Sequence, residues 1–461
     1  MEELVDRISN LPEDILRDNI VSRLPLKVAA RTSVLSSRWR SLWKSVPDLD
    51  FHFQIWESIM DCDINDSLGL VLSEKRREFV GIVNRIIQLH EGLRVKRLRV
   101  FFNPGSVYEA DMKKWIQFAF DKGVQELDLN FHMIFREQYI IPGYMLECNS
   151  VTRLKLAYCR ILPSISSFKG LSSLKSVSLS RVRLDEDLIN SLFVPCSCIE
   201  SLQMVECTEA RCLRIAPRNH SFKKLKVSNC WTIFHIEIDA PHLQTFEFCG
   251  HEVNFQINNI CRLQDAMLNI RGPKPIDTSS ISRSLRMLWA AVSRVRVATF
   301  SCSVIQILPP TSLIQACRHH MNSETLPPGM DSSQEYLDFP SSPGYSPRLK
   351  MIRFDGFQGL NCEMMLLSSC FSYATALESL TIVVPQDGDP DEVTEKVWKL
   401  AKFYNRPPDA PESSYMAKIR PRSRSMPQPL IRVMSYSEKS GATHSPTHKD
   451  IVHHYRSAHD W

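Results

Sequence analysis

One short apolar pattern recurs through the middle of the chain and restricts how that part can fold. An apolar residue at position n is followed by others at n+3 and n+5, as in Val95, Leu98 and Val100. Copies of the pattern begin at residues 95, 124, 151, 174, 199, 222 and 243. In a strand, positions n+3 and n+5 point to the same face. One such strand cannot bury that face alone, so we expect the copies to stack and share one core.

The spacing of the copies indicates the kind of repeat. Their starts lie 21 to 29 residues apart, which fits leucine-rich repeats. We therefore predict a leucine-rich-repeat solenoid over residues 90–302. Beyond Leu263 the pattern weakens, and Val297, Phe300 and Cys302 form its weakest copy.

Three cysteines, Cys159, Cys207 and Cys230, fall at position n+8 of their repeats. Leucine-rich repeats place Asn or Cys there, where the side chain bonds backbone groups at the turn after the strand. A zinc site that also uses the nearby Cys196 and Cys198 is the alternative. Structural zinc usually binds paired Cys-x2-Cys thiols, which this set lacks. We therefore expect no metal at these thiols.

The first fifty residues follow a helical period instead. Apolar residues one, three or four positions apart run from Ile8 to Leu24, which indicates one face of a helix. Pro12 suits the first turn of this helix, and Pro25 ends it because proline disfavours helical geometry in the residue before it. A second helical run reaches residue 46, with a break expected at Ser36. Helices this short only marginally bury a core, so we expect the module to bind a partner.

Four segments of this module have fixed spacing: Leu11-Pro12-x-x-Ile15-Leu16, then Leu24-Pro25, then Thr32-Ser33-Val34-Leu35-Ser36-Ser37-Arg38-Trp39-Arg40-x-Leu42-Trp43, then Val46-Pro47-x-Leu49-Asp50-Phe51. Together they resemble the F-box, in the form common in plants, over residues 8–53. The resemblance implies docking on a Skp-type adaptor, and through it on a cullin-RING scaffold and a ubiquitin-conjugating enzyme. An amphipathic helical hairpin without a partner is the alternative. The expected fold class is an α/β repeat solenoid that follows an N-terminal all-α F-box module.

The resemblance also implies which side chains meet the adaptor. By their position in the motif, eight residues are expected to contact it: Leu11, Pro12, Ile15, Leu16, Leu24, Pro25, Val34 and Leu35. Three others, Trp39, Leu42 and Trp43, are expected to pack the module itself.

Proline marks divisions in the rest of the chain. Residues 303–347 are rich in Pro and Ser, which predicts a linker or insertion. The block 348–404 resembles the FBD region that ends many plant F-box repeat proteins, through Leu349-Lys350-x-Ile352-x-Phe354-x-Gly356-Phe357-x-Gly359 and Ala376-Leu377-Glu378-x-Leu380-Thr381-Ile382. In the final stretch, residues 406–461 carry nine Lys and Arg against five Asp and Glu. We expect residues 405–461 to form a basic disordered tail.

The exposed strand positions of a solenoid, n+2, n+4 and n+6, commonly form its recognition surface, and the first copy places Arg97, Arg99 and Phe101 there. Basic side chains at these positions predict that an acidic or phosphorylated segment of a protein substrate binds there. Those residues are Arg97, Arg99, Arg153, Lys155, Lys224 and Lys226. Ordinary solvated strand residues are the alternative interpretation.

The chain contains no phosphate-binding loop, no Gly-x-Ser-x-Gly elbow and no His-Glu-x-x-His motif. We therefore expect a non-catalytic substrate receptor of a ubiquitin ligase, without a cofactor, which selects a protein for proteasomal degradation. Two alternatives stay open: a small-molecule-dependent co-receptor, and a nucleic-acid-associated regulator that uses the basic tail. Nucleic acid is not an expected partner, because a tail with four net charges binds it only weakly.

The sequence also carries expectations about location. The acidic start of the chain does not resemble a signal peptide, and no segment approaches the roughly 20 apolar residues that span a bilayer. We expect no membrane partner and a protein of the nucleus, the cytoplasm or both.

Overall fold

The computed structural model forms two compact units, which are described separately. The first comprises Met1–Arg211 and Pro217–Phe222, and the second comprises Cys212–Ala216 and Lys223–Trp461. The structure describes residues 8, 11–52, 68–132, 138–162, 168–185, 188–189, 192–193, 196–217, 220–270, 295–301, 348–360, 363–364, 366–367, 370–371, 374, 376–385, 388–404 and 429–435. The Pro/Ser-rich segment 303–347 lies outside these residues.

Short helices form the N-terminal module of the first unit. They are α1 (Glu13–Ile15), η1 (Leu16–Ile20), η2 (Val21–Arg23), α2 (Leu26–Arg31), η3 (Thr32–Val34), η4 (Ser37–Trp39) and η5 (Leu42–Ser45). The first helix begins directly after Pro12, and Leu24 is extended before Pro25. Ser36 is extended as well and breaks the second run. The predicted helix start, end and break are therefore confirmed.

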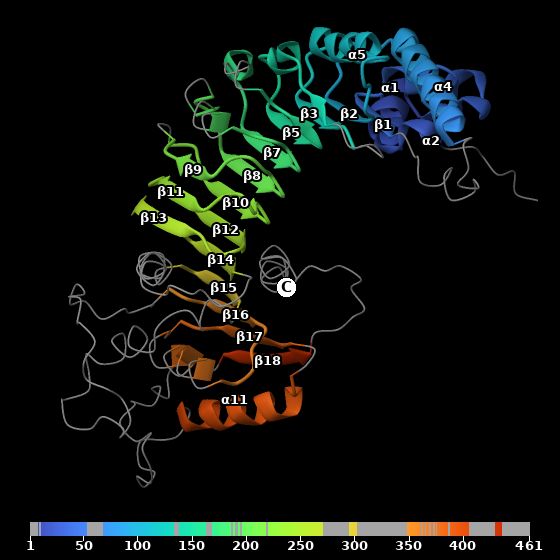
Figure 1. Cartoon of the computed structure of the whole chain (residues 1–461). Helices are drawn as coiled ribbons and strands as arrows, with labels where there is room; N and C mark the ends of the chain where they lie inside the picture. Colours follow the sequence, from blue (N-terminus) through green and yellow to red (C-terminus); the bar gives the residue numbers. More distant parts are fainter. Residues whose placement is uncertain are drawn as a thin grey trace, which may run out of the picture. The chain divides into compact units, whose positions relative to one another are not determined.

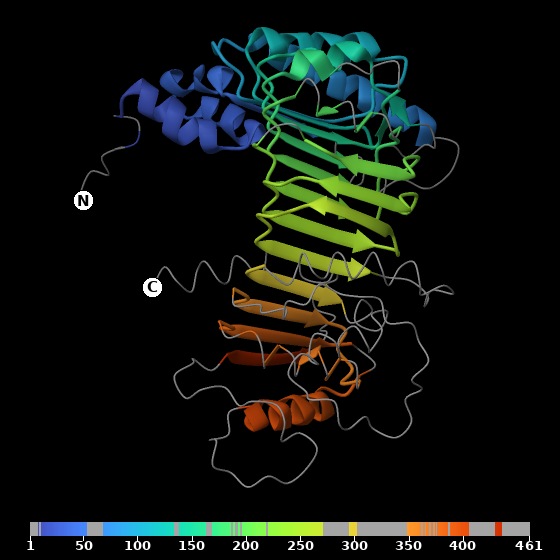
Figure 2. The same cartoon turned by 90° about the vertical axis from the view of Figure 1, so that its left-hand side faces the viewer.

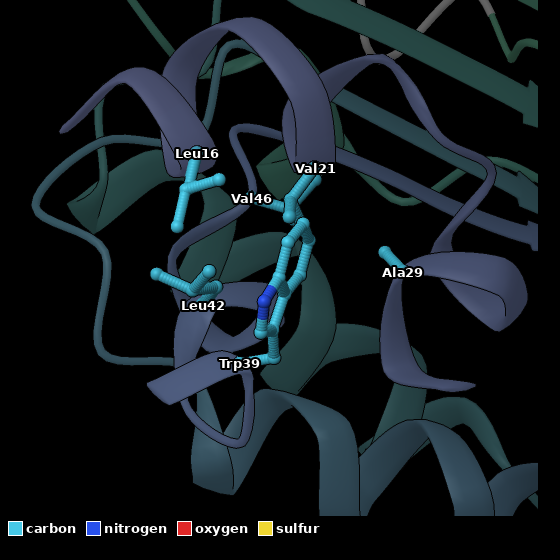
Figure 3. Close-up of a cluster of buried hydrophobic side chains, with 6 residues drawn as sticks. All are labelled: Leu16, Val21, Ala29, Trp39, Leu42 and Val46. Atoms are coloured by element: carbon cyan, nitrogen blue, oxygen red, sulfur yellow. The ribbon is translucent and has the colours of Figure 1, made fainter. Parts of the chain in front are cut away.

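A small apolar core holds the module together. Figure 3 shows the Trp39 indole among the other buried side chains of this core, which are Leu16, Val21, Ala29, Leu42 and Val46. Trp43 is partly buried and packs against the same cluster. The prediction that Trp39, Leu42 and Trp43 pack the module is confirmed.

Six parallel strands form the sheet of the first unit (Figure 1). In sheet order they are β1 (Asp48–His52), β2 (Arg97–Phe101), β3 (Glu126–Asn130), β5 (Arg153–Ala157), β7 (Ser176–Ser180) and β8 (Ser201–Val205). The apolar residues at n, n+3 and n+5 of each predicted copy are buried, which confirms the stacking.

The sheet begins earlier than expected. Val46, Leu49 and Phe51 follow the same n, n+3, n+5 pattern and are buried, and β1 pairs along its length with β2. The tail of the helical module is therefore the first strand of the repeat array. The predicted start of the solenoid at residue 90 missed this strand.

Helices and short strands lie beside this sheet in the first unit. They are α4 (Leu68–Leu89), α5 (Glu109–Asp121), β4 (Tyr139–Ile140), η6 (Gly143–Leu146), β6 (Cys159–Arg160) and η8 (Phe168–Leu171). Asn84 of α4 joins the two long helices, because its amide accepts from Trp115 Nε1 at 2.7 Å and donates to Asp111 at 2.9 Å.

The second unit continues the repeat pattern in its own parallel strands, which Figure 2 shows as aligned arrows. They are β10 (Lys224–Ser228), β12 (Thr245–Gly250), β14 (Asp265–Ile270), β15 (Val297–Ser301), β16 (Met351–Asp355), β17 (Ser379–Val384) and β18 (Leu430–Ser435). A three-stranded sheet of β9 (Cys212–Ile215), β11 (His235–Asp239) and β13 (Asn254–Asn259) and the helix α11 (Pro390–Tyr404) complete the unit.

The structure corrects the register of β15. Val297 pairs with Asp265 and Met351, which are both n+2 positions. The buried n+3 and n+5 residues of β15 are therefore Ala298 and Phe300, and the prediction that Val297 begins this copy is wrong. The n, n+3, n+5 pattern also recurs from Leu349 and from Leu377, and its apolar residues are buried at β16 and β17.

The structure also corrects part of the predicted tail. Residues 430–435 form β18, which pairs with β17 through Ile431 opposite Leu380 and Val433 opposite Ile382. This segment is therefore ordered, although residues 405–461 were all predicted to be disordered. Most of the remaining tail, on which the nucleic-acid alternative depends, lies outside the described residues.

Candidate protein-binding surfaces

The helical module exposes several apolar side chains, most of all at Val34 and Leu35. Val34 is 85% exposed and Leu35 is 64% exposed, and Val28 of α2, Pro12 and Pro25 are exposed as well. Burying a Val or Leu side chain contributes about 1.5–3 kcal/mol. Val34 and Leu35 are adjacent in the chain and largely exposed, so together they form an apolar face that a partner can cover.

The other residues predicted to contact the adaptor are less accessible. Leu11, Ile15 and Leu24 are partly buried. Leu16 is 0% exposed and lies in the core of the module. Its expected direct contact with a partner does not fit this burial, because its side chain faces the cluster around Trp39.

Several contacts fix the module to the repeat strands of the first unit. The backbone N–H of Glu91 donates to the Lys44 carbonyl at 2.8 Å, and the two side chains form an ion pair at 2.8 Å. The ring of His90 lies 3.1 Å from the Val46 carbonyl. Together with the pairing of β1 and β2, these contacts give the exposed apolar face a fixed place relative to this sheet.

The exposed positions of the first four strands carry alternating charges. The n+2 row is Asp48, Arg97, Glu126 and Arg153, and the n+4 row is Asp50, Arg99, Asp128 and Lys155. In the first row, Arg97 lies 2.7 Å from Glu126, which also pairs with Arg153. In the second row, Arg99 lies 3.1 Å from both Asp50 and Asp128, and Lys155 lies 3.7 Å from Asp128.

The ion pairs in these rows make the predicted basic surface less available to an acidic ligand. Each row holds two acidic and two basic side chains, so its formal charge is zero. Arg97, Arg99, Arg153 and Lys155 are therefore already paired, and an acidic ligand would have to compete with carboxylates of this chain. In the second unit, Lys226 lies 2.9 Å from Glu247, while Lys224 is exposed.

A third set of side chains follows the strand ends of the first unit and was not predicted. This strand-end row comprises His52, Phe101, His132, Tyr158, Arg181 and Glu206, each in contact with the next. The ring centroids of neighbouring aromatic members lie 4.4 to 6.0 Å apart. The Arg181 guanidinium lies 5.1 Å from the Tyr158 ring centroid and pairs with Glu206 at 2.5 Å.

The backbone at this edge has a repeated strained conformation. Tyr158, Arg181, Glu206 and Asn229 all occupy position n+7, and all have φ between 52° and 56°. A residue with a Cβ costs about 1–2 kcal/mol there, whereas glycine does not. The repeat pattern fixes the position n+7, but the residue types there vary from copy to copy, so the sequence carried no signal for this conformation.

Two of the three cysteines at n+8, Cys207 and Cys230, bond backbone groups as predicted. Cys159, Cys207 and Cys230 are buried. The Cys207 thiol donates to the Leu179 carbonyl at 3.5 Å, and the Cys230 thiol donates to the Ser228 carbonyl at 3.5 Å. Burial raises the pKa of the Cys159 thiol. Among the described residues, no group of three or more His, Cys, Asp or Glu could hold a metal ion.

Within the part of the chain that the structure describes, no helix is both long enough and apolar enough to span a membrane.

Comparison with known proteins finds a family match for each of the two regions. Residues 8–50 match the model of the F-box domain, and residues 86–303 match a model described as the LRR domain of At1g61320/AtMIF1. The FBD-like block 348–404 lies beyond both matched ranges and stays a prediction.

The similar proteins are from Arabidopsis thaliana. The FBD-associated F-box protein At1g61320 is 32% identical over 54% of this chain and 51% of its own length. The F-box/FBD/LRR-repeat protein At1g13570 is 31% identical over 44% of this chain and 45% of its own length. The F-box protein At5g03100 is 24% identical over 68% of this chain and 93% of its own length. The chain thus spans about half the length of the first two.

Proposed function

Because the chain joins an N-terminal F-box to a leucine-rich-repeat domain, we propose that it is the substrate-recognition subunit of an SCF-type ubiquitin ligase. The exposed apolar face of the module carries this proposal. Val34 and Leu35 protrude from a domain too small to bury them, and a Skp-type adaptor supplies the surface that covers them. The adaptor in turn connects the chain to a cullin-RING scaffold.

The role of the chain is positional and not catalytic. The F-box binds the adaptor, and the repeats hold a protein substrate near a conjugating enzyme that carries ubiquitin. Holding two reactants together raises their effective concentration without chemistry from the receptor. The fixed attachment of the module to the first repeat strands supports this role, because a rigid receptor presents its substrate in a defined place. The complex acts in the nucleus, the cytoplasm or both.

A binding assay with purified Skp-type adaptor and the full chain tests the proposal. Leu35→Asp should weaken adaptor binding at least about tenfold, because it removes buried apolar area and introduces a charge. Leu93→Asp is the matched control, since Leu93 is 92% exposed on the same unit but outside the apolar face. It should bind like the unmodified chain. Equal binding by both variants and the unmodified chain would sink the proposal.

A further inference from the structure

The strand-end row presents a continuous surface of rings. The rings of His52 and Phe101 meet edge to face at 4.4 Å, those of Phe101 and His132 stack at 6.0 Å, and those of His132 and Tyr158 meet edge to face at 4.6 Å. Their residues end four neighbouring strands, β1, β2, β3 and β5. His52 is exposed, and the other three are partly exposed. A ligand laid across the strands can therefore contact several rings in turn.

The two oppositely charged members of the row offset each other. Arg181 and Glu206 neutralise each other at 2.5 Å. Burial and the nearby Arg181 lower the pKa of His132, so its imidazole is neutral. The n+2 and n+4 rows beside it are also balanced. This surface therefore favours an uncharged, apolar ligand over an acidic or basic one.

The spacing of the rings selects the conformation of that ligand. Phe101 is in register across β3 with Ala157, the residue before Tyr158. Neighbouring strands lie about 4.8 Å apart, so the strand ends that carry the Phe101 and Tyr158 rings are about 9.6 Å apart. A polyproline II helix repeats every three residues at about 3.1 Å each, or about 9.3 Å. An extended β-strand repeats one face every 6.6–6.8 Å, which matches neither one strand spacing nor two. The polyproline II repeat fits and the β repeat does not.

The edge of the row also offers a hydrogen-bond donor. Arg181 donates to the Tyr158 hydroxyl oxygen, so the hydroxyl hydrogen points elsewhere. The backbone carbonyls of a polyproline II segment have no internal partner and can accept it. Aromatic rings combined with such donors are how proline-rich segments are bound in other recognition domains.

From this geometry we infer that the strand-end row binds a proline-rich segment of a protein partner in the polyproline II conformation, with ring contacts at Phe101 and Tyr158. This inference rests on the proposed function, because that function identifies the protein partner as the substrate. The three left-handed residues Tyr158, Arg181 and Glu206 fit this role, because each keeps a side chain where glycine would relieve strain.

Fluorescence anisotropy with the full chain and a labelled decaproline peptide tests the inference. The peptide should bind more tightly than a Gly-Ser peptide of equal length. Tyr158→Gly should weaken binding about tenfold, as expected for the loss of one aromatic contact. Since glycine suits the left-handed backbone there, the fold should survive, which circular dichroism checks. Phe101→Leu keeps an apolar side chain but removes the second ring, so it should also weaken binding.

Two controls complete the experiment. Tyr158→Phe keeps the ring and should lose less affinity than Tyr158→Gly. Trp231→Ala removes an exposed aromatic residue of the second unit and should leave binding unchanged. Equal binding of both peptides, or unchanged decaproline binding by Tyr158→Gly and Phe101→Leu, would overturn the inference. Adaptor binding by Tyr158→Gly and Phe101→Leu tests the proposed function separately. Both variants keep the apolar face of the F-box, so they should bind the adaptor whether or not they bind decaproline.

Discussion

The ring of His90 contacts the backbone carbonyl of Val46, with Nε2 at 3.1 Å from the oxygen. Val46 belongs both to the core of the F-box and to the first repeat strand's n position, while His90 follows the end of α4. The carbonyl can only accept, so Nε2 carries the proton. The other ring nitrogen, Nδ1, is buried without a hydrogen-bond partner among the described residues. His90 thus connects the F-box to the repeats, and this buried contact is favourable only while the imidazole is neutral.

This contact predicts a pH dependence of stability. Burial lowers the pKa of His90 in the folded state, and the nearby Lys122 adds to this effect. The unfolded chain then binds a proton that the folded chain resists, so stability falls as pH drops from about 7 to about 5. His90→Gln can still donate to Val46 but cannot titrate. We expect a smaller loss of Tm over this range in the variant, measured by thermal unfolding. An identical pH profile would contradict the role of His90.

The F-box core predicts that Trp39 is a folding residue and Leu35 a binding residue. Trp39→Ala removes the ring around which the core packs and should cost about 3–5 kcal/mol. A module this small should then be cleaved readily by protease, and adaptor binding should be lost with it. Leu35→Asp should instead resist protease like the unmodified chain while it loses the adaptor. Equal protease resistance of Trp39→Ala and the unmodified chain would show that the core is not formed as described.

The sequence predicted the parts of the fold that depend on local periodicity. The strand β2 could be predicted because Leu98 and Val100 are both large, apolar and at the fixed spacing of the repeat. The n+3 residue of β15 is Ala298. Alanine contributes little to an apolar pattern, so the sequence predicted the wrong register for β15. The strand β18 was missed because Leu430–Ser435 lies alone after a long proline-rich stretch and its partner β17 is distant in sequence.

The surfaces were harder to predict than the strands. Arg97 and Glu126 are 29 residues apart, and only the register of β2 and β3 places them opposite each other. The sequence indicated the basic residues but not the carboxylates that pair with them. The ring row was likewise not predicted, because its members occupy three repeat positions, n+6 for His52 and Phe101, n+8 for His132 and n+7 for Tyr158, and meet only across strands.

The charged rows predict that Glu126 stabilises the first unit. Its carboxylate pairs with both Arg97 and Arg153, and it is more buried than either. Glu126→Gln leaves two guanidinium groups with a weaker acceptor, so we expect a loss on the order of 1 kcal/mol, which shrinks at high salt. Glu200→Gln is a control, since Glu200 pairs only loosely with Lys175 at 3.6 Å. Denaturant unfolding measures both, and equal effects would contradict the special position of Glu126.

The cysteines predict a sharp pattern of alkylation in the native state. The thiolate is the reactive form, and burial both raises the pKa of Cys159 and blocks reagent access. Cys198 and Cys261 are exposed, so iodoacetamide should modify them first, as mass spectrometry of the digested protein would reveal. Cys159, Cys207 and Cys230 should become reactive only when denaturant unfolds the repeats. Rapid labelling of Cys159 in the native chain would mean that the turn after β5 opens, since its thiol lies inside the shared core of the repeats.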